Sequence, residues 1–173
     1  MNLNACIQHA TQTLIDHVEE LTALDQAIGD GDHGLNMKRG SLAIQAKLPS
    51  LEGQPMAAVL KTLGMTCMST IGGSSGPVFG TLLVTLSKEL PENAGPADCA
   101  RALQAGIEAL TRLGKAEVGQ KTLLDVLEYK PKFDAAAIFA PLGLADEPAG
   151  PYRPCDLEAR DFIGWPRHLA VHH

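Results

Sequence analysis

Residues 7–24 read IQHATQTLIDHVEELTAL, and this stretch decides the fold class of the chain. Apolar side chains return in it every three or four residues, which is the period of an α-helix. The residues on this stripe are Ile7, Ala10, Leu14, Val18, Leu21 and Leu24. The stripe predicts an amphipathic first helix whose apolar face packs against neighbouring elements. Gly29 ends this helix, and residues 28–34, IGDGDHG, predict a turn-rich loop.

Helical signals continue from this loop to about residue 129. Proline suits the first turn of a helix, so Pro55, Pro77 and Pro96 mark helix starts, whereas Pro49 stops the helix before it. The helices predicted in this way cover residues 35–48, 55–67, 77–90, 96–114 and 122–129. The chain contains no internal repeat and no convincing run of strand-like alternation. The sequence therefore predicts an all-α fold.

Composition agrees with one helical domain. The chain has 173 residues, of which 45% are hydrophobic and only 4% are aromatic, so its core must be built from aliphatic side chains. The net charge is −6, and no cluster of Lys and Arg could grip a phosphate backbone. We therefore expect no nucleic acid partner, and we expect any phosphorylated ligand to be bound with the help of a metal cation or backbone dipoles.

Cysteine spacing and hydropathy indicate a cytoplasmic protein. None of the four cysteines forms a C-x-x-C pair or a zinc-ligand pattern with histidine, so we expect reduced thiols: Cys6, Cys67, Cys99 and Cys155. No apolar run approaches the roughly 18 residues of a membrane span, and the N-terminus has no signal-peptide pattern. We expect neither export nor membrane insertion.

Three carboxylates fall within eight residues, at Asp25, Asp30 and Asp32. Clustered carboxylates repel one another unless a cation lies between them, and Mg²⁺ prefers such oxygen ligands. Gly29 and Gly31 would let the backbone turn these side chains inward. The alternative is a polar loop whose aspartates cap the next helix. The spacing alone leaves both interpretations open.

A second motif is the run Gly72-Gly73-Ser74-Ser75-Gly76, which leads into a predicted helix. Its consecutive amides and the helix N-terminus could bind an anion. It is neither a Walker A loop, because no G-K-[ST] follows, nor a Rossmann fingerprint, because no strand precedes it. A plain helix-to-helix turn remains the alternative. Together, the acidic loop and this turn have the components of a magnesium–nucleotide site.

Three blocks of the sequence resemble the signature blocks of the dihydroxyacetone kinase L subunit. They are LDQAIGDGDHGLNMKRG (residues 24–40), GMTCMSTIGGSSGPVFGT (residues 64–81) and GKAEVGQKTLLDVL (residues 114–127). The resemblance covers roughly residues 5–130. It implies a barrel of eight antiparallel α-helices that binds a nucleotide at one end.

The resemblance also implies a set of site residues. Asp25, Asp30 and Asp32 would hold two Mg²⁺ ions that bridge the phosphates of ADP or ATP. Other residues would contact the nucleotide itself: His33, Gly34, Leu35, Asn36, Ser74 and Ser75 at the phosphates, and Gly114 and Leu123 at the adenine. No covalent nucleophile on this chain is required.

The function implied is that of a kinase subunit. In phosphotransferase-linked members of the family, bound ADP relays a phosphoryl group from a phosphohistidine on the M subunit to dihydroxyacetone on the K subunit. In ATP-dependent members the nucleotide exchanges as a substrate. The chain looks more like the first type, since no substrate domain is fused to it. Two alternatives stay open: an impaired nucleotide-binding or regulatory module, and an ATP-dependent kinase domain for another small substrate.

The chain departs from the family within the third block and after it. Gln120 replaces a usual Asp, Leu123 replaces a common Met, and residues 131–173 do not resemble the family's late segment. Six of the eleven prolines lie in this Pro-rich tail, so we divide the chain into a nucleotide-binding domain, residues 1–130, and an atypical tail, residues 131–173. A replaced C-terminus, as from a shifted reading frame, would explain the change. We then expect weaker, exchangeable nucleotide binding and self-association, with a homodimer among the expected partners.

Overall fold

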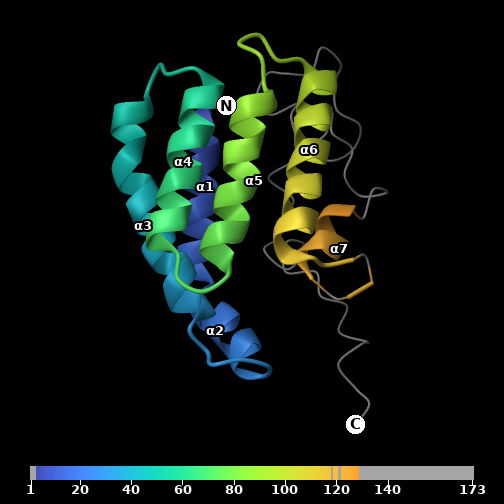
Figure 1. Cartoon of the computed structure of the whole chain (residues 1–173). Coiled ribbons are helices and arrows are strands. Elements are labelled where there is room, and N and C mark those ends of the chain that lie inside the picture. The colour runs from blue at the N-terminus through green and yellow to red at the C-terminus, as the bar shows by residue number, and fades with distance from the viewer. Residues whose placement is uncertain (1–2, 118, 121, 129–173) are drawn as a thin grey trace, which may run out of the picture.

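The computed structural model describes residues 3–117, 119–120 and 122–128, and in this part all regular structure is helical. The prediction of an all-α fold is thus confirmed. The helices are α1 (Leu3–Asp16), α2 (Val18–Gln26), α3 (His33–Leu51), α4 (Met56–Thr70), α5 (Ser75–Glu89), α6 (Pro96–Gly114) and α7 (Leu123–Glu128) (Figure 1). The tail predicted to be atypical, residues 131–173, lies outside the described residues.

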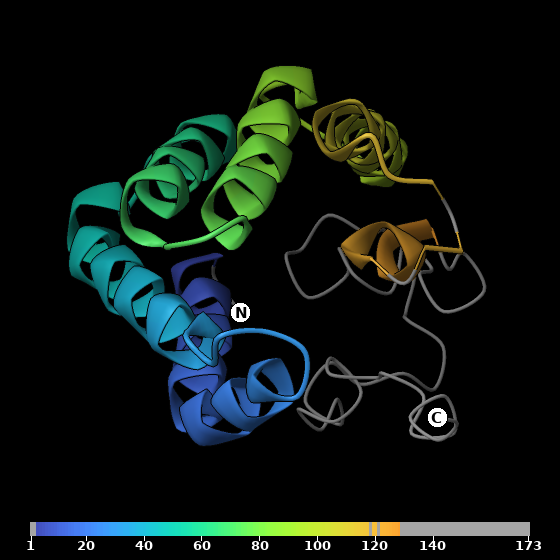
Figure 2. The same ribbon diagram turned by 60° about the horizontal axis from the view of Figure 1, so that its bottom comes forward.

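Helices α3 to α6 run alternately up and down, so that each packs antiparallel to the next (Figure 1). Seen end on, these four helices follow one another along an arc, and α1 and α2 both pack against α3 (Figure 2). This arrangement agrees with the antiparallel helical barrel that the resemblance implied. None of the helices in the described part combines the length and the apolar character that a membrane span requires.

The main core lies where α3 and α4 meet and is aliphatic, as the low aromatic content required. Its buried residues are Met37, Ile44, Leu51, Val59, Leu63, Cys67 and Ile71. Three residues of the predicted first stripe, Ile7, Leu14 and Leu21, pack against this core. Leu24, at the end of the same stripe, is 48% exposed. The stripe therefore reaches the core over most of its length and leaves it near the acidic loop.

The first helix is interrupted, contrary to the single helix predicted over residues 7–24. Its α1 part ends at Asp16 and α2 begins at Val18. The ring Nδ1 of the intervening His17 lies 2.8 Å from the Thr13 carbonyl oxygen, which also accepts the His17 amide. A side chain that competes for a backbone carbonyl disturbs helical geometry at that point.

The prediction that the helix ends at residue 48, before Pro49, is wrong by three residues, because α3 continues to Leu51. Proline removes one backbone donor, and it does so here only in the last turn of the helix. The two residues beyond it bring Leu51, which is 6% exposed, into the core. Burial of that leucine offsets the lost hydrogen bond.

Glycines allow α4 and α5 to approach closely. A Cβ built on Gly64 would lie 2.9 Å from the Gly80 carbonyl oxygen and 3.0 Å from the Val84 amide nitrogen. Neither backbone atom can move without displacing α5. By contrast, a Cβ on Gly106 of α6 would meet mainly the Leu82 side-chain methyl, at 2.6 Å. The α4–α5 contact therefore requires glycine, whereas the contact at Gly106 can adapt.

We predict that Gly64→Ala destabilises the chain by about 2 kcal/mol, as overpacking does, and that Gly106→Ala costs less than about 1 kcal/mol because Leu82 can change rotamer. Urea unfolding of the two variants measures the difference. Equal losses of stability would contradict the close backbone contact between α4 and α5.

The three cysteines in the described part are free, as predicted, and they differ in accessibility. Cys6 is half-buried, whereas Cys67 and Cys99 are 3% and 0% exposed. Burial raises the pKa of the Cys67 thiol to about 11 and also raises the pKa of Cys99. Only about one Cys67 thiol in a thousand is then ionised at pH 8. Both buried thiols should react slowly.

We therefore expect iodoacetamide at pH 8 to alkylate Cys6 within minutes, while Cys67 and Cys99 react only after unfolding in urea. Mass spectrometry of tryptic peptides measures each site separately. Rapid alkylation of Cys67 in the native protein would contradict the buried α3–α4 core.

Candidate functional site

The three sequence blocks meet at one end of the helices. The loop after α2, the turn between α4 and α5, and the segment between α6 and α7 all lie at the lower end in Figure 1, and Figure 2 shows this end turned toward the viewer. The antiparallel arrangement explains this convergence, because α3 and α5 both begin at this end while α2, α4 and α6 finish there.

The acidic loop brings its carboxylates together. One oxygen each of Asp25, Asp30 and Asp32 lies within 4.8 Å of the other two. Gly31 has φ +75°, a left-handed conformation that side chains disfavour, and a Cβ on Gly29 would lie 2.6 Å from the Asp25 carboxylate. Both glycines are thus needed for the loop to hold the three side chains at this separation.

Of the three aspartates, only Asp25 has a carboxylate that accepts a backbone amide at the start of α3. Asp32 occupies the N-cap position of α3 and its side chain makes no capping hydrogen bond. The Asp25 carboxylate instead accepts the backbone N–H of His33, at 3.2 Å. Among the described residues, the carboxylates of Asp30 and Asp32 have neither a hydrogen bond nor an ion pair. Three adjacent carboxylates, two of them without partners, form a donor set that suits a divalent cation.

Two helix N-termini present free backbone amides at this end. The first backbone hydrogen bonds of α3 and α5 run from Asn36 to the Asp32 carbonyl and from Val78 to the Ser74 carbonyl. The earlier amides in each first turn lack a helical acceptor. Those of Gly34, Leu35, Ser75 and Gly76 have no other hydrogen-bond acceptor among the described residues. Such amides, with the positive ends of two helix dipoles, favour an anion such as phosphate.

His33 and Ser75 connect the two helix starts. The Ser75 hydroxyl lies 3.3 Å from His33 Nδ1, across 42 residues of sequence. This contact brings two predicted phosphate-binding residues together from different blocks. Ser74, the N-cap residue of α5, is exposed, and its side chain makes no capping hydrogen bond. Its hydroxyl is therefore available to a ligand.

The residues that follow His33 differ in orientation. Gly34 is buried, and a Cβ there would collide with the Val18 carbonyl and the Thr22 hydroxyl, so glycine lets α3 begin against α2. The Leu35 side chain is 61% exposed, so only its backbone amide suits a phosphate. Asn36 is 7% exposed and lies beside the glycine-rich turn.

The third block forms its own hydrogen-bonded loop. Gly114 ends α6, and Lys115 after it has φ 48°. The Gln120 side chain accepts the Glu117 amide at 3.0 Å, and the Asp125 carboxylate accepts the Thr122 amide at 2.7 Å, next to Leu123 at the start of α7. The predicted adenine residues Gly114 and Leu123 thus lie at the same end of the helices as the carboxylates.

Arg39 belongs to this region, although the sequence interpretation did not select it. Its Nε donates to the Thr70 carbonyl at 2.8 Å, and its Nη2 donates to Asn36 Oδ1 at 2.5 Å. In the sequence, the feature that could have pointed to Arg39 is its spacing: it lies three residues after Asn36, so that the two side chains are neighbours on α3. That spacing alone does not reveal a contact with the end of α4.

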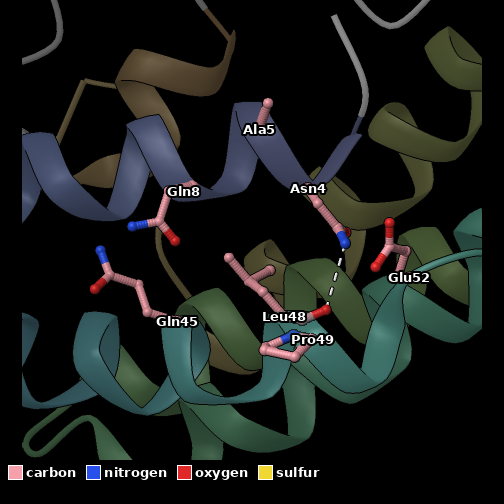
Figure 3. A pocket seen from close by; sticks show the side chains of 7 residues that line it. All are labelled: Asn4, Ala5, Gln8, Gln45, Leu48, Pro49 and Glu52. Carbon is pink, nitrogen blue, oxygen red and sulfur yellow. Dashed lines mark hydrogen bonds between the residues drawn. The ribbon is translucent and has the colours of Figure 1, made fainter.

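A groove elsewhere on the molecule does not suit a nucleotide. It has a volume of about 370 Å³ and is lined by Asn4, Ala5, Gln8, Gln45, Leu48, Pro49 and Glu52 (Figure 3). It lies between the start of α1 and the end of α3, at the far end of α3 from the carboxylates (Figure 1). Its lining contains a carboxylate and no cation, so it does not favour phosphates.

We predict that Asp30→Asn leaves the helix content unchanged and slightly raises the unfolding temperature in EDTA, because it removes like-charge repulsion at an exposed site. The same change should abolish stabilisation by Mg²⁺. Thermal unfolding followed by circular dichroism measures both effects, with Asp16→Asn on α1 as the control. A variant that Mg²⁺ stabilises as much as the parent would exclude the metal site.

Sequence comparison assigns the chain to a family of known proteins. The family profile described as DAK2 domain matches residues 27–133, which is more than half of the chain. The ADP-binding subunit of PEP-dependent dihydroxyacetone kinase 1 from Listeria innocua is 41% identical over 109 residues, 62% of this chain and 55% of that protein. The corresponding subunit from Escherichia coli is 39% identical over 110 residues, 62% of this chain and 52% of that protein.

A third relative is human triokinase/FMN cyclase, 36% identical over 124 residues, which are 70% of this chain and 21% of that protein. The chain spans about half the length of the two bacterial subunits that it matches. The match to the family profile includes two of the aspartates, the glycine-rich turn and the third block. By these matches, the chain belongs to the DAK2 domain family.

Proposed function

We propose that this chain is the nucleotide-carrying subunit of a dihydroxyacetone kinase. In this role it holds Mg–ADP while a phosphoryl group passes from a phosphohistidine on an M subunit to dihydroxyacetone on a K subunit. The observation that carries the proposal is the position of three clustered carboxylates beside the free N-termini of α3 and α5. The names of the bacterial relatives, ADP-binding subunits of dihydroxyacetone kinases, supply the substrate.

Charge explains why both halves of the site are needed. The chain has net charge −6, and the acidic loop by itself repels a nucleotide diphosphate. In the proposal, Asp25, Asp30 and Asp32 hold two Mg²⁺ ions. Bound Mg²⁺ would neutralise phosphate charge and orient the transferred group. The two helix starts then bind the phosphate oxygens that the metal leaves free.

Each remaining site residue has a distinct proposed role. The amides of Gly34, Leu35 and Ser75 and the hydroxyl of Ser74 donate to phosphate oxygens. The His33 ring and the Asn36 side-chain amide add donors from the face of α3 that meets the turn. Gly114 and Leu123 border the adenine in this proposal. The chain contributes positioning and charge and no covalent nucleophile, so we expect activity only with partner subunits.

A second candidate is an ATP-dependent kinase domain for another small substrate. The observation that favours it is the similarity to human triokinase/FMN cyclase, which extends over 70% of this chain. Nucleotide exchange distinguishes the two modes. A relay subunit works with bound ADP as a cofactor, whereas an ATP-dependent domain must release ADP after each turnover.

The first test is thermal unfolding of the full chain with and without ADP, in Mg²⁺ and in EDTA. We predict an upshift that needs both ADP and Mg²⁺, equivalent to about 2.7 kcal/mol when ADP is at a hundredfold excess over Kd. A cooperative transition whose temperature does not change with ADP and Mg²⁺ would identify a folded chain without a nucleotide site. That result would favour the alternative of an impaired nucleotide-binding or regulatory module.

The second test supplies partners. The chain preloaded with Mg–ADP is combined with the K subunit of a bacterial dihydroxyacetone kinase and with M subunit that already carries its phosphohistidine, and phosphorylation of dihydroxyacetone is measured. We predict product formation that Asp30→Ala abolishes, since losing one carboxylate from a shared metal site costs on the order of 3 kcal/mol, about a hundredfold in affinity. Turnover only with added ATP would support the second candidate instead.

A further inference from the structure

We propose that Arg39 is a positioning residue that fixes the Asn36 side-chain amide so that its NH₂ group, and not its oxygen, faces the nucleotide phosphates. The inference rests on the proposed function, since it concerns the same site. It assigns a role to a residue that neither touches the acidic loop nor belongs to the predicted nucleotide contacts. Four observations support it.

The first is the chemistry of the Arg39–Asn36 pair. A guanidinium carries only donors, so the Asn36 atom that meets Arg39 Nη2 at 2.5 Å must be the carbonyl oxygen Oδ1. An asparagine amide can otherwise present either end to a ligand. With Oδ1 held by Arg39, Nδ2 must point away from the guanidinium. Asn36 thereby offers two donors, which suit phosphate oxygens.

The second observation is that Asn36 Nδ2 has no hydrogen-bond partner among the described residues and is not fully buried. Asn36 as a residue is 7% exposed, and the only side-chain hydrogen bond it makes among the described residues is the one to Arg39. In that part of the chain no fully buried side-chain nitrogen or oxygen lacks a hydrogen-bond partner. Nδ2 is therefore not fully buried, although Asn36 as a residue is only 7% exposed.

The third is the position of the pair against the glycine-rich turn. A Cβ on Gly72 would lie 2.5 Å from Asn36 Oδ1 and 2.8 Å from Arg39 Nη2. The turn thus lies directly over the pair and leaves no room for a side chain. Arg39 Nε also donates to the Thr70 carbonyl, at the end of α4. One guanidinium therefore fixes both the amide of Asn36 and the start of the turn.

The fourth is the charge of Arg39. Among the described residues no carboxylate lies within ion-pair distance of its guanidinium, which leaves the positive charge available near the proposed phosphates. Asn36 lies one helical turn beyond His33 on α3, and His33 contacts Ser75 at the start of α5. His33, Asn36 and Arg39 follow one another at about one helical turn along α3, so Asn36 lies between the His33–Ser75 contact and Arg39.

The test compares four variants of the full chain by calorimetric titration with Mg–ADP and by unfolding temperature without nucleotide. Asn36→Asp keeps the contact with Arg39 as an ion pair but presents a carboxylate oxygen to phosphate. Arg39→Lys keeps a donor-only side chain, and Arg39→Gln has an oxygen that lets the Asn36 amide turn over. Lys38→Gln, at an exposed neighbouring site, controls for the loss of one positive charge.

We expect Asn36→Asp to unfold at or above the parent temperature while its Kd for Mg–ADP rises by at least about tenfold, since a donor to a charged group is replaced by a repelling oxygen. Arg39→Gln should raise Kd about tenfold, Arg39→Lys by no more than about threefold, and Lys38→Gln by less than about twofold. In ¹⁵N-labelled protein, Mg–ADP should shift the Asn36 side-chain NH₂ signals in the parent and in Arg39→Lys, and not in Arg39→Gln.

The inference would be overturned if Asn36→Asp bound Mg–ADP as tightly as the parent. It would also be overturned if Arg39→Gln and Lys38→Gln raised the Kd for Mg–ADP by the same factor. If the parent binds Mg–ADP and Arg39→Gln binds it equally well, only the positioning role fails. If the parent binds no Mg–ADP, the proposed function fails, and this role in nucleotide binding fails with it.

Discussion

Repulsion among Asp25, Asp30 and Asp32 is the constraint on which the rest of this site depends. Their oxygens lie within 4.8 Å of one another, and only Asp25 has a hydrogen-bond donor among the described residues, the His33 amide. The packing of α2 against α3 fixes both ends of this loop, because Gly34 lets the two helices meet without a side chain between them.

Antiparallel packing then places the anion-binding half of the site. The starts of α3 and α5 lie at one end because α4 returns the chain, and the glycine contact between α4 and α5 keeps this hairpin tight. His33 and Ser75 join the two starts, and Arg39 joins α3 to the end of α4. The acidic loop and the free amides are therefore parts of one arrangement, which in the proposed function would hold a cation and an anion together.

The sequence predicts most of this arrangement, and its failures have physical causes. Helix starts at Pro55 and Pro96 follow from local backbone rules and lie within a residue of the prediction. The break at His17 depends on which carbonyl its ring reaches, and the passage of α3 through Pro49 depends on the burial of Leu51. Neither is encoded in periodicity, because the first depends on a local side-chain contact with the Thr13 carbonyl and the second on tertiary packing.

The same distinction separates the predicted site residues from Arg39. The three aspartates fall within eight residues, so their spacing alone indicated a cluster. Arg39 acts across 31 residues on the Thr70 carbonyl, and its meaning appears only once α3 and α4 are packed. A donor-only side chain that selects one end of a neighbouring amide leaves no pattern in the sequence. In the proposed site, whose ligands would carry opposite charges, Arg39 would orient the Asn36 amide so that its donors face the anion.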